Sequence, residues 1–197
     1  MNNKIAFFDF DGTITHKDTL PEIIRFIKGR RAFYLGMIQS LPWLIAMKLK
    51  IISNASAKEK LLAIFFKGLA FHEFQQKCNE FIQFRLPHLL RPAAISEINK
   101  YKQEGTTVVV VSASVEDWIV GWCDHLQIKC LATRLEVING KITGRIAGKN
   151  CNGTEKVNRI KALFNLNDYK TIIAYGDSNG DKPMLSLAAI AYYKPFR

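Results

Sequence analysis

The sequence has little cysteine, and none in the spacing of a metal site. Four cysteines occur in 197 residues, and no two form a CxxC pair. This scarcity argues against a disulfide scaffold or a cysteine-ligated zinc site and is typical of reduced thiols in a cytoplasmic protein. We also expect no signal peptide, because Asp9 and Asp11 interrupt the only apolar run near the N-terminus.

Acidic residues are few compared with basic ones. The chain has 28 lysines and arginines against 17 aspartates and glutamates, a formal net charge of +11. This balance favours an anionic partner, which leaves phosphate esters, an anionic membrane surface or nucleic acid. Because RNP-like, zinc-finger and helix-turn-helix signals are absent, we do not expect nucleic acid as a partner.

Strand-like and helical segments alternate along most of the chain. The predicted strands are 4–8, 106–111, a hairpin within 131–146 around Asn139 and Gly140, 171–175 and 189–193. The predicted helices are 93–104, 115–126, 155–164 and 183–187. This alternation predicts an α/β fold with a doubly wound parallel sheet. Residues 20–86 are helical in pattern without a convincing strand, so we expect a core of 1–15 and 89–197 with an inserted helical cap of 16–88.

Two pairs of acidic residues each follow a predicted strand. Asp9 and Asp11 follow the first strand, and Asp177 and Asp181 follow the strand at 171–175. Ligands of open α/β sheets bind outside the carboxyl ends of the strands, and converging carboxylates suit Mg²⁺. One aspartate of the first pair can attack phosphorus to form an aspartyl-phosphate, while the other exchanges protons with the leaving group and water.

Other residues in the chain can bind the oxygens of a phosphoryl group. Ser112 ends a buried strand and offers a hydroxyl group. The backbone N–H groups of Ala113 and Ser114 can add donors if they open a helix. Lys156, at the start of a predicted helix, is a candidate cation.

Together these residues follow the order of the four motifs of the haloacid dehalogenase (HAD) superfamily. The motifs are Asp9-Phe10-Asp11-Gly12-Thr13, Ser112 after a valine run, Lys156, and Gly176-Asp177-x-x-Gly180-Asp181. The sequence most resembles the phosphoserine-phosphatase-like branch, which inserts its cap after the first motif. The resemblance therefore implies a Mg²⁺-dependent HAD-type phosphatase with a Rossmann-like core.

Carried over by position, the resemblance assigns a role to each motif residue. It makes Asp9 the nucleophile and Asp11 the general acid/base. It implies that Mg²⁺ is bound by the Asp9 carboxylate, the Asp11 backbone carbonyl and Asp177, with Asp181 in support. Ser112 and Lys156 would hold the phosphoryl group. An N-cap role in the following helix would also explain Asp181.

The sequence departs from phosphoserine phosphatases at the positions that recognise substrate. Asp18 stands where those enzymes carry a glutamate, and their cap arginine has no clear counterpart, although Lys58 and Lys60 lie nearby. We therefore expect the substrate to be either a small phosphorylated metabolite or a lipid phosphate. A non-catalytic phosphate-binding or membrane-docking module is the alternative function.

An apolar segment at 32–47 lies inside the predicted cap. Basic residues flank it at 28–31 and 48–50, and it is short for a membrane span. Two interpretations stay open: a buried cap helix, or a segment (28–50) lying on an anionic membrane surface. The apolar segment, Gly153-Thr154-Glu155-Lys156 and Asp177-Ser178-Asn179-Gly180-Asp181 also resemble phosphatidylglycerophosphatases of the C type. This resemblance implies that a lipid phosphate is a possible substrate alongside a small metabolite. We thus expect a cytoplasmic protein, either free or peripheral at the inner face of the membrane.

Overall fold

One mixed sheet forms the centre of the molecule. The computed structural model describes residues 3–196, and within them the strands form a six-stranded sheet in the order β4-β3-β2-β1-β5-β6. The strands are β1 (Lys4–Phe8), β2 (Thr107–Val115), β3 (Lys129–Ile138), β4 (Lys141–Ala147), β5 (Thr171–Gly176) and β6 (Ile190–Tyr193). All neighbours are parallel except β3 and β4, which form an antiparallel pair around Asn139 and Gly140.

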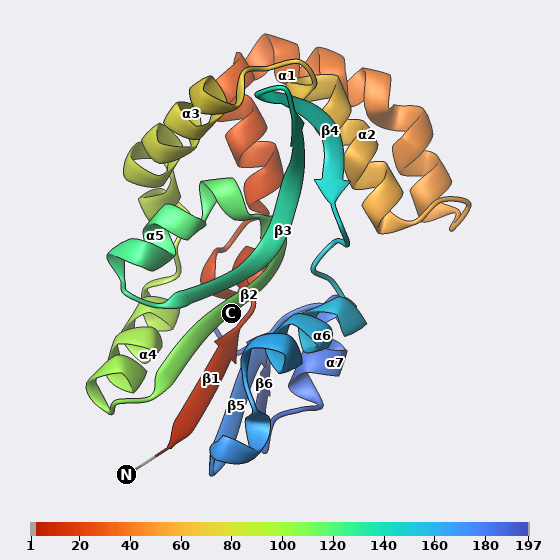
Figure 1. Cartoon of the computed structure of the whole chain (residues 1–197). Helices are drawn as coiled ribbons and strands as arrows, with labels where there is room; N and C mark the ends of the chain where they lie inside the picture. The colour runs from red at the N-terminus through yellow and green to blue at the C-terminus, as the bar shows by residue number, and fades with distance from the viewer. Residues whose placement is uncertain (1–2, 197) are drawn as a thin grey trace.

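Helices cover both faces of this sheet (Figure 1). Phe8 packs in the same apolar cluster as residues of α4 (Pro92–Gln103) and α5 (Val120–His125). Phe7 faces the other way and packs with residues of α6 (Thr154–Leu163) and α7 (Lys182–Leu185). Successive strand residues point to opposite faces, so β1 is apolar throughout because both of its faces are buried. The predicted doubly wound α/β fold is confirmed.

The helix predicted at 115–126 is wrong in its first part. Val115 belongs to β2, which continues past an irregularity after Ser112 and pairs again with Thr133. A short 3₁₀ turn (Glu116–Trp118) precedes α5, which begins only at Val120. The buried position of Val115 in the core keeps it in the strand.

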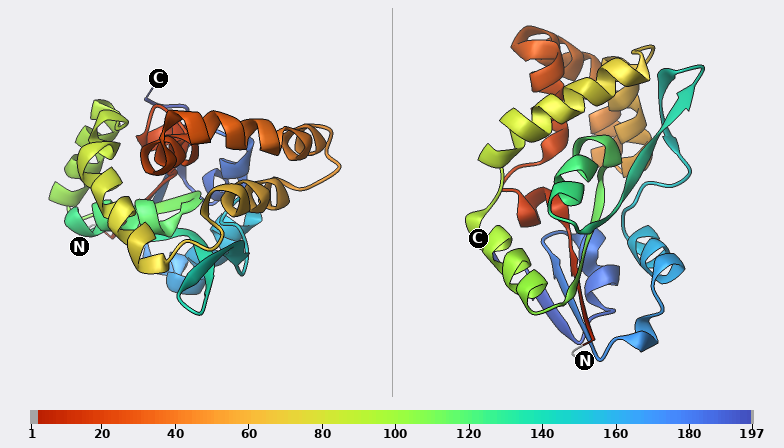
Figure 2. Two further views of the ribbon diagram at one scale, coloured as in Figure 1. Left: turned by 90° about the horizontal axis from the view of Figure 1, so that it is seen from above. Right: turned by 60° about the vertical axis from the view of Figure 1, so that its left-hand side comes forward.

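Three α-helices lie between β1 and α4, in the region predicted to form the cap. They are α1 (Thr19–Lys48), α2 (Asn54–Phe66) and α3 (Phe71–Phe84). Gly29 interrupts α1 with φ 77° and ψ 168°, a conformation that favours glycine, so its two parts differ in direction. Figure 2 shows the second part of α1 and α2 running side by side as an arm that extends from the rest of the molecule.

The arm is held to the core through the β3–β4 hairpin. The backbone N–H of Gly68 donates to Ile142, and the N–H of Phe71 donates to Gly140. The α1 and α2 helices approach closely at Gly36, where a Cβ atom would lie 2.3 Å from the Phe65 ring. The cap boundaries of 16 and 88 stay a prediction.

The four cysteines carry free thiols, as the sequence predicts. Cys78, Cys123 and Cys151 are buried, and Cys130 is half-buried. Burial raises the pKa of the Cys151 thiol to about 11. These side chains therefore act as small apolar core residues.

Candidate active site

The first acidic motif (Asp9 and Asp11) lies where β1 ends, beside the end of β5 that leads to the second acidic motif (Asp177 and Asp181). The N–H of Asp9 donates to the carbonyl of Tyr175 at 2.9 Å, so the two strands end together. The chain then turns sharply through Gly12, which has φ 81°. A Cβ atom on Gly12 would lie 2.5 Å from Asp177 Oδ2, so only glycine lets the first loop approach the second acidic motif.

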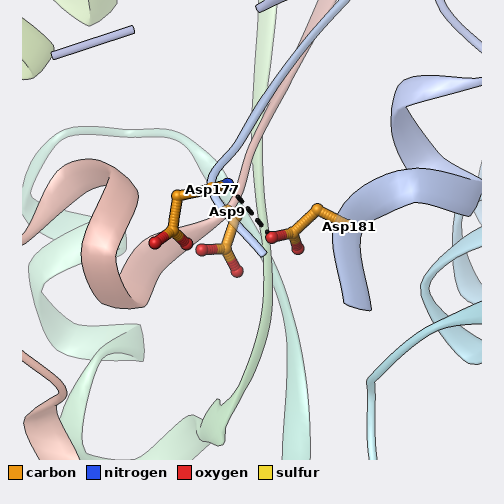
Figure 3. A group of neighbouring side chains, drawn as sticks. All are labelled: Asp9, Asp177 and Asp181. Carbon is orange, nitrogen blue, oxygen red and sulfur yellow. Dashed lines mark hydrogen bonds between the residues drawn. The ribbon is translucent and has the colours of Figure 1, made fainter. Parts of the chain in front are cut away.

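Three carboxylates converge at this point. Each of Asp9, Asp177 and Asp181 offers an oxygen atom, and these atoms lie within 4.8 Å of one another (Figure 3). Asp9 and Asp181 are buried, and Asp177 is half-buried. Burial raises the pKa of Asp9 to about 7, although the neighbouring Lys156 ammonium acts in the opposite direction.

Lys156, near the start of α6, contacts two of these carboxylates. Its Nζ atom lies 2.5 Å from Asp9 Oδ1 and 2.6 Å from Asp181 Oδ1, and the residue is 1% exposed. Burial alone would lower the pKa of Lys156, but the two carboxylates raise it above its ordinary value. A bond from the N–H of Gly153 to the carbonyl of Gly180 joins the loop before α6 to the second acidic motif.

Asp181 does not act as a side-chain N-cap of α7, so that alternative is wrong. No side-chain cap bond is present at the start of α7. Asp181 Oδ2 instead accepts bonds from the N–H groups of Asp177 (3.2 Å) and Ser178 (2.9 Å) and from the Ser178 hydroxyl. Lys156 bonds to the other oxygen, Oδ1, so both oxygens of Asp181 have partners. The turn at 178–181 folds the side chain back toward Lys156.

Asp11 points away from the three carboxylates, toward the cap. Its Oδ1 atom accepts the N–H of Thr19 at 2.8 Å, and its Oδ2 atom accepts the Ser114 hydroxyl. The Thr19 hydroxyl lies 3.0 Å from Ser114 Oγ and accepts the indole N–H of Trp118. Burial and the nearby charge of Asp18 raise the pKa of Asp11 to about 6. A carboxyl group held in this way is suited to proton transfer near neutral pH.

The phosphate-binding residues predicted on β2 lie near this site but not at a helix start. Ser112 is buried, and its Oγ atom accepts the N–H of Ser114 at 3.0 Å. The predicted helix N-terminus at Ala113 and Ser114 is wrong, because both residues are in β2. The carbonyl of Ala113 accepts bonds from Lys58 and from the Thr133 hydroxyl.

The three predicted specificity residues occupy different positions. Lys58 reaches from α2 to the Ala113 carbonyl, and its Nζ atom lies 3.4 Å from Asn150 Oδ1. Burial lowers the pKa of Lys58 to about 8, although Asp11 and Asp18 act in the opposite direction. Asp18 is the N-cap of α1 and accepts the N–H of Leu20. Lys60 is exposed, and its Nζ atom lies 4.9 Å from the centre of the Trp43 ring.

The donor set of the acidic cluster fits a hard divalent cation. It consists of carboxylate oxygens, which Mg²⁺ prefers. Three ionised carboxylates and one ammonium leave an excess charge of −2, which one divalent cation would balance. The bonds at both oxygens of Asp181 favour a supporting role for it.

Several side-chain contacts around the site are not predicted from the sequence, which indicates only the backbone N–H of Ser114. Thr19, Ser114 and Trp118 orient Asp11, while Thr133 and Asn150 surround the tip of Lys58. They come from different elements and form no motif in the sequence. Only the closeness of Ser114 to Ser112 could have indicated one of them.

Comparison with known proteins identifies the family. The model of haloacid dehalogenase-like hydrolases matches residues 6–186. The chain belongs to this family. It is 32% identical over 197 residues to the protein CicA of Caulobacter vibrioides strain NA1000 / CB15N, covering 98% of this chain and 86% of that protein.

Solved structures share the fold of this HAD hydrolase. A protein of unknown function from Bordetella pertussis Tohama I matches with a TM-score of 0.83 and 20% identity, covering 97% of this chain and 89% of that one. A substrate-bound phosphoserine phosphatase matches with a TM-score of 0.69 and 20% identity, covering 98% and 86%. The predicted superfamily is confirmed by the family model.

Proposed function

We propose that this HAD hydrolase is a Mg²⁺-dependent phosphomonoesterase that acts through an aspartyl-phosphate on Asp9. One observation carries the proposal. The Asp9, Asp177 and Asp181 carboxylates converge and Lys156 contacts two of them, Asp9 and Asp181. Asp11 is held separately by Thr19 and Ser114. This arrangement provides a charged centre for a phosphoryl group and an independent group for proton transfer.

The two aspartates divide the chemistry between them. An Asp9 oxygen attacks phosphorus, the bond from phosphorus to the ester oxygen breaks, and Asp11 donates its proton to the departing alcohol. Asp11 then removes a proton from water, whose oxygen attacks phosphorus, and the Asp9 carboxylate and inorganic phosphate are released. The raised pKa of Asp11, about 6, is compatible with both steps.

The remaining motif residues position the phosphoryl group. Lys156, the Ser112 hydroxyl and the backbone of Ala113 would bind its oxygens. When bound by the Asp9 and Asp177 carboxylates and the Asp11 carbonyl, with Asp181 in support, Mg²⁺ would neutralise charge on the phosphoryl oxygens. Asp181 would also hold Lys156 in place through their 2.6 Å contact.

The proposed substrate is a phosphate monoester, either a small metabolite or a lipid phosphate such as phosphatidylglycerophosphate. Residues of the predicted cap would select between them. Lys58 bonds to the Ala113 carbonyl, and the charges of Asp11 and Asp18 both raise its pKa against the effect of burial. We propose Lys58 and Asp18 as specificity residues, with Lys60 as a more distant contributor. An ammonium group in this place favours a second anionic or polar group on the substrate.

The proposed location is the cytoplasm, with peripheral contact to the inner face of the membrane through residues 28–50. Among the described residues, no helix is long and apolar enough to cross a membrane. The second part of α1 exposes large apolar side chains beside basic residues. Such a surface supports contact with an anionic bilayer and brings a lipid phosphate within reach.

A phosphate-release screen tests the proposed function. Wild type is assayed with p-nitrophenyl phosphate, small phosphate monoesters and lipid phosphates in vesicles, with Mg²⁺ present. The Asp9→Asn variant should lose turnover with all of them, and Asp124→Asn, an exposed substitution of the same chemistry, should keep it. If Asp9→Asn keeps a tenth of the wild-type rate, Asp9 is not the nucleophile.

A further inference from the structure

The second part of α1 carries a solvent-facing stripe with a basic residue at each end. Its members follow helical spacing and are all exposed: Arg30, Tyr34, Ile38, Leu41, Ile45 and Lys48. The four apolar members are 60%, 64%, 48% and 55% exposed. Residues spaced by three or four along a helix lie on one face, so these side chains form one continuous strip.

A different face of the same helix packs within the predicted cap. Phe33, Gly36 and Ser40 are buried, and Phe33 stacks on Phe65 of α2 with ring centroids 6.3 Å apart. The stripe is therefore not needed to hold α1 against α2. A strip of large apolar side chains facing water marks a contact surface.

A basic groove opens at the Arg30 end of the stripe. This groove, of about 600 Å³, is lined by Lys17, Glu22, Arg25, Arg30, Tyr34 and Arg85. Its four cations and one carboxylate give a net charge of +3. Arg30 and Tyr34 belong to both the groove and the stripe, so the two surfaces are continuous.

Glu22 fixes two of the groove arginines in place. Its Oε2 atom accepts bonds from Arg85 Nε at 3.0 Å and Nη2 at 2.6 Å, and its Oε1 atom accepts from Arg25 at 3.2 Å. Arg25 also lies 4.2 Å from the centre of the Phe33 ring. Since these side chains are already ordered, binding an anion between them would cost little conformational entropy.

We propose that this combined surface docks the protein on an anionic phospholipid bilayer, with a phospholipid phosphate in the groove and the stripe lying against the acyl chains. The proposal refines the peripheral membrane contact proposed above and rests on it. Residues 23–58 contain seven basic residues and no acidic one, which matches an anionic surface. A second copy of this chain is less suited to the stripe, because each copy brings a net charge of +11.

Vesicle co-sedimentation of the full chain tests the proposal. Wild type should bind vesicles of an equal mixture of phosphatidylcholine and phosphatidylglycerol more strongly than vesicles of phosphatidylcholine alone. Added salt should weaken this binding. The groove variant is Lys17→Gln with Arg30→Gln, since neither side chain forms an ion pair or hydrogen bond within residues 3–196. The stripe variant is Ile38→Gln with Ile45→Gln.

The expected effects are separate and measurable. At about 1 kcal/mol per charge, the groove variant should bind the anionic vesicles roughly 30-fold more weakly. The stripe variant should bind both vesicle types at least about tenfold more weakly. The charge-matched control, Lys129→Gln with Lys170→Gln, changes exposed residues at the opposite end of the sheet and should bind as wild type does.

Several results would overturn the docking proposal. They are no vesicle binding by wild type at low salt, equal binding by the groove variant and wild type, or a wild-type dimer that the stripe variant converts to monomers. Because sedimentation needs no catalysis, it can be interpreted even if no phosphate monoester is hydrolysed. Unchanged thermal unfolding of both variants would show that lost binding does not reflect lost structure.

Discussion

Removing the Lys156 ammonium should destabilise the protein strongly, and by an amount that depends on pH. The group is 1% exposed and lies 2.5 Å from Asp9 and 2.6 Å from Asp181. In the variant Lys156→Met, two buried carboxylates lose their counter-charge. Breaking a buried ion pair from one side costs about 3–5 kcal/mol, and we expect a loss in this range near neutral pH.

The pH dependence follows from the Asp9 carboxyl group. Its pKa is raised from 3.8 to about 7 in the folded chain, so folded Asp9 keeps a proton that the unfolded chain loses at lower pH. Its contribution to stability is therefore present below the unfolded value and is lost as pH rises through about 7. Without Lys156 the Asp9 pKa should rise further, so the deficit relative to wild type should grow as pH rises past about 7.

Urea unfolding in chelator measures this loss. Wild type, Lys156→Met and the exposed control Lys182→Met are compared at about pH 5 and about pH 8, and the control should stay within about 0.5 kcal/mol of wild type. Adding Asp181→Asn to Lys156→Met should restore part of the stability, because one uncompensated carboxylate is removed. A loss below about 1 kcal/mol for Lys156→Met, equal at both pH values, would refute the reasoning.

Three further predictions concern the metal, the cap cation and the packing of the arm. Phosphate release should stop in chelator and return with Mg²⁺, whereas Ca²⁺ should inhibit because its flexible coordination misaligns Asp9. Full activity after exhaustive chelation would contradict the metal site. KM should rise as pH passes about 8, where Lys58 loses its charge, and Lys58→Arg should remove this rise with little change in kcat. The same dependence of KM on pH in Lys58→Arg and wild type would exclude Lys58 from substrate binding. Gly36→Ala should lower the free energy of unfolding by about 1–3 kcal/mol, because its Cβ would lie 2.3 Å from Phe65, while the exposed control Gln39→Ala should not. Equal urea midpoints for Gly36→Ala and wild type would refute the close helix contact.

The sequence was informative where one local signal determines the structure. Buried β-branched runs predict the strands, and the motif positions of Asp9, Asp177 and Lys156 lead to groups that do converge. The hairpin around Asn139 and Gly140 follows from its turn residues. In each case a few neighbouring residues carry the information.

The missed features depend on contacts between distant segments. The bonds that hold Asp11 come from Thr19 and Ser114, in different elements, and β2 extends to Val115 because that residue pairs with Thr133. The side chain of Asp181 accepts a bond from Lys156 and makes no cap bond to α7. The apolar segment at 32–47 was ambiguous since only the packing of α2 decides which face of α1 stays exposed.

Detection of a covalent phosphoryl group on Asp9 is the most direct test of the proposed mechanism. Wild type mixed with p-nitrophenyl phosphate and Mg²⁺ is quenched in acid during turnover, and its peptides are analysed by mass spectrometry. We predict one added phosphoryl group on the peptide that contains Asp9, lost on treatment with hydroxylamine and absent from Asp9→Asn. Turnover without such an adduct under conditions where its breakdown is rate-limiting, or an adduct on another residue, would contradict the account.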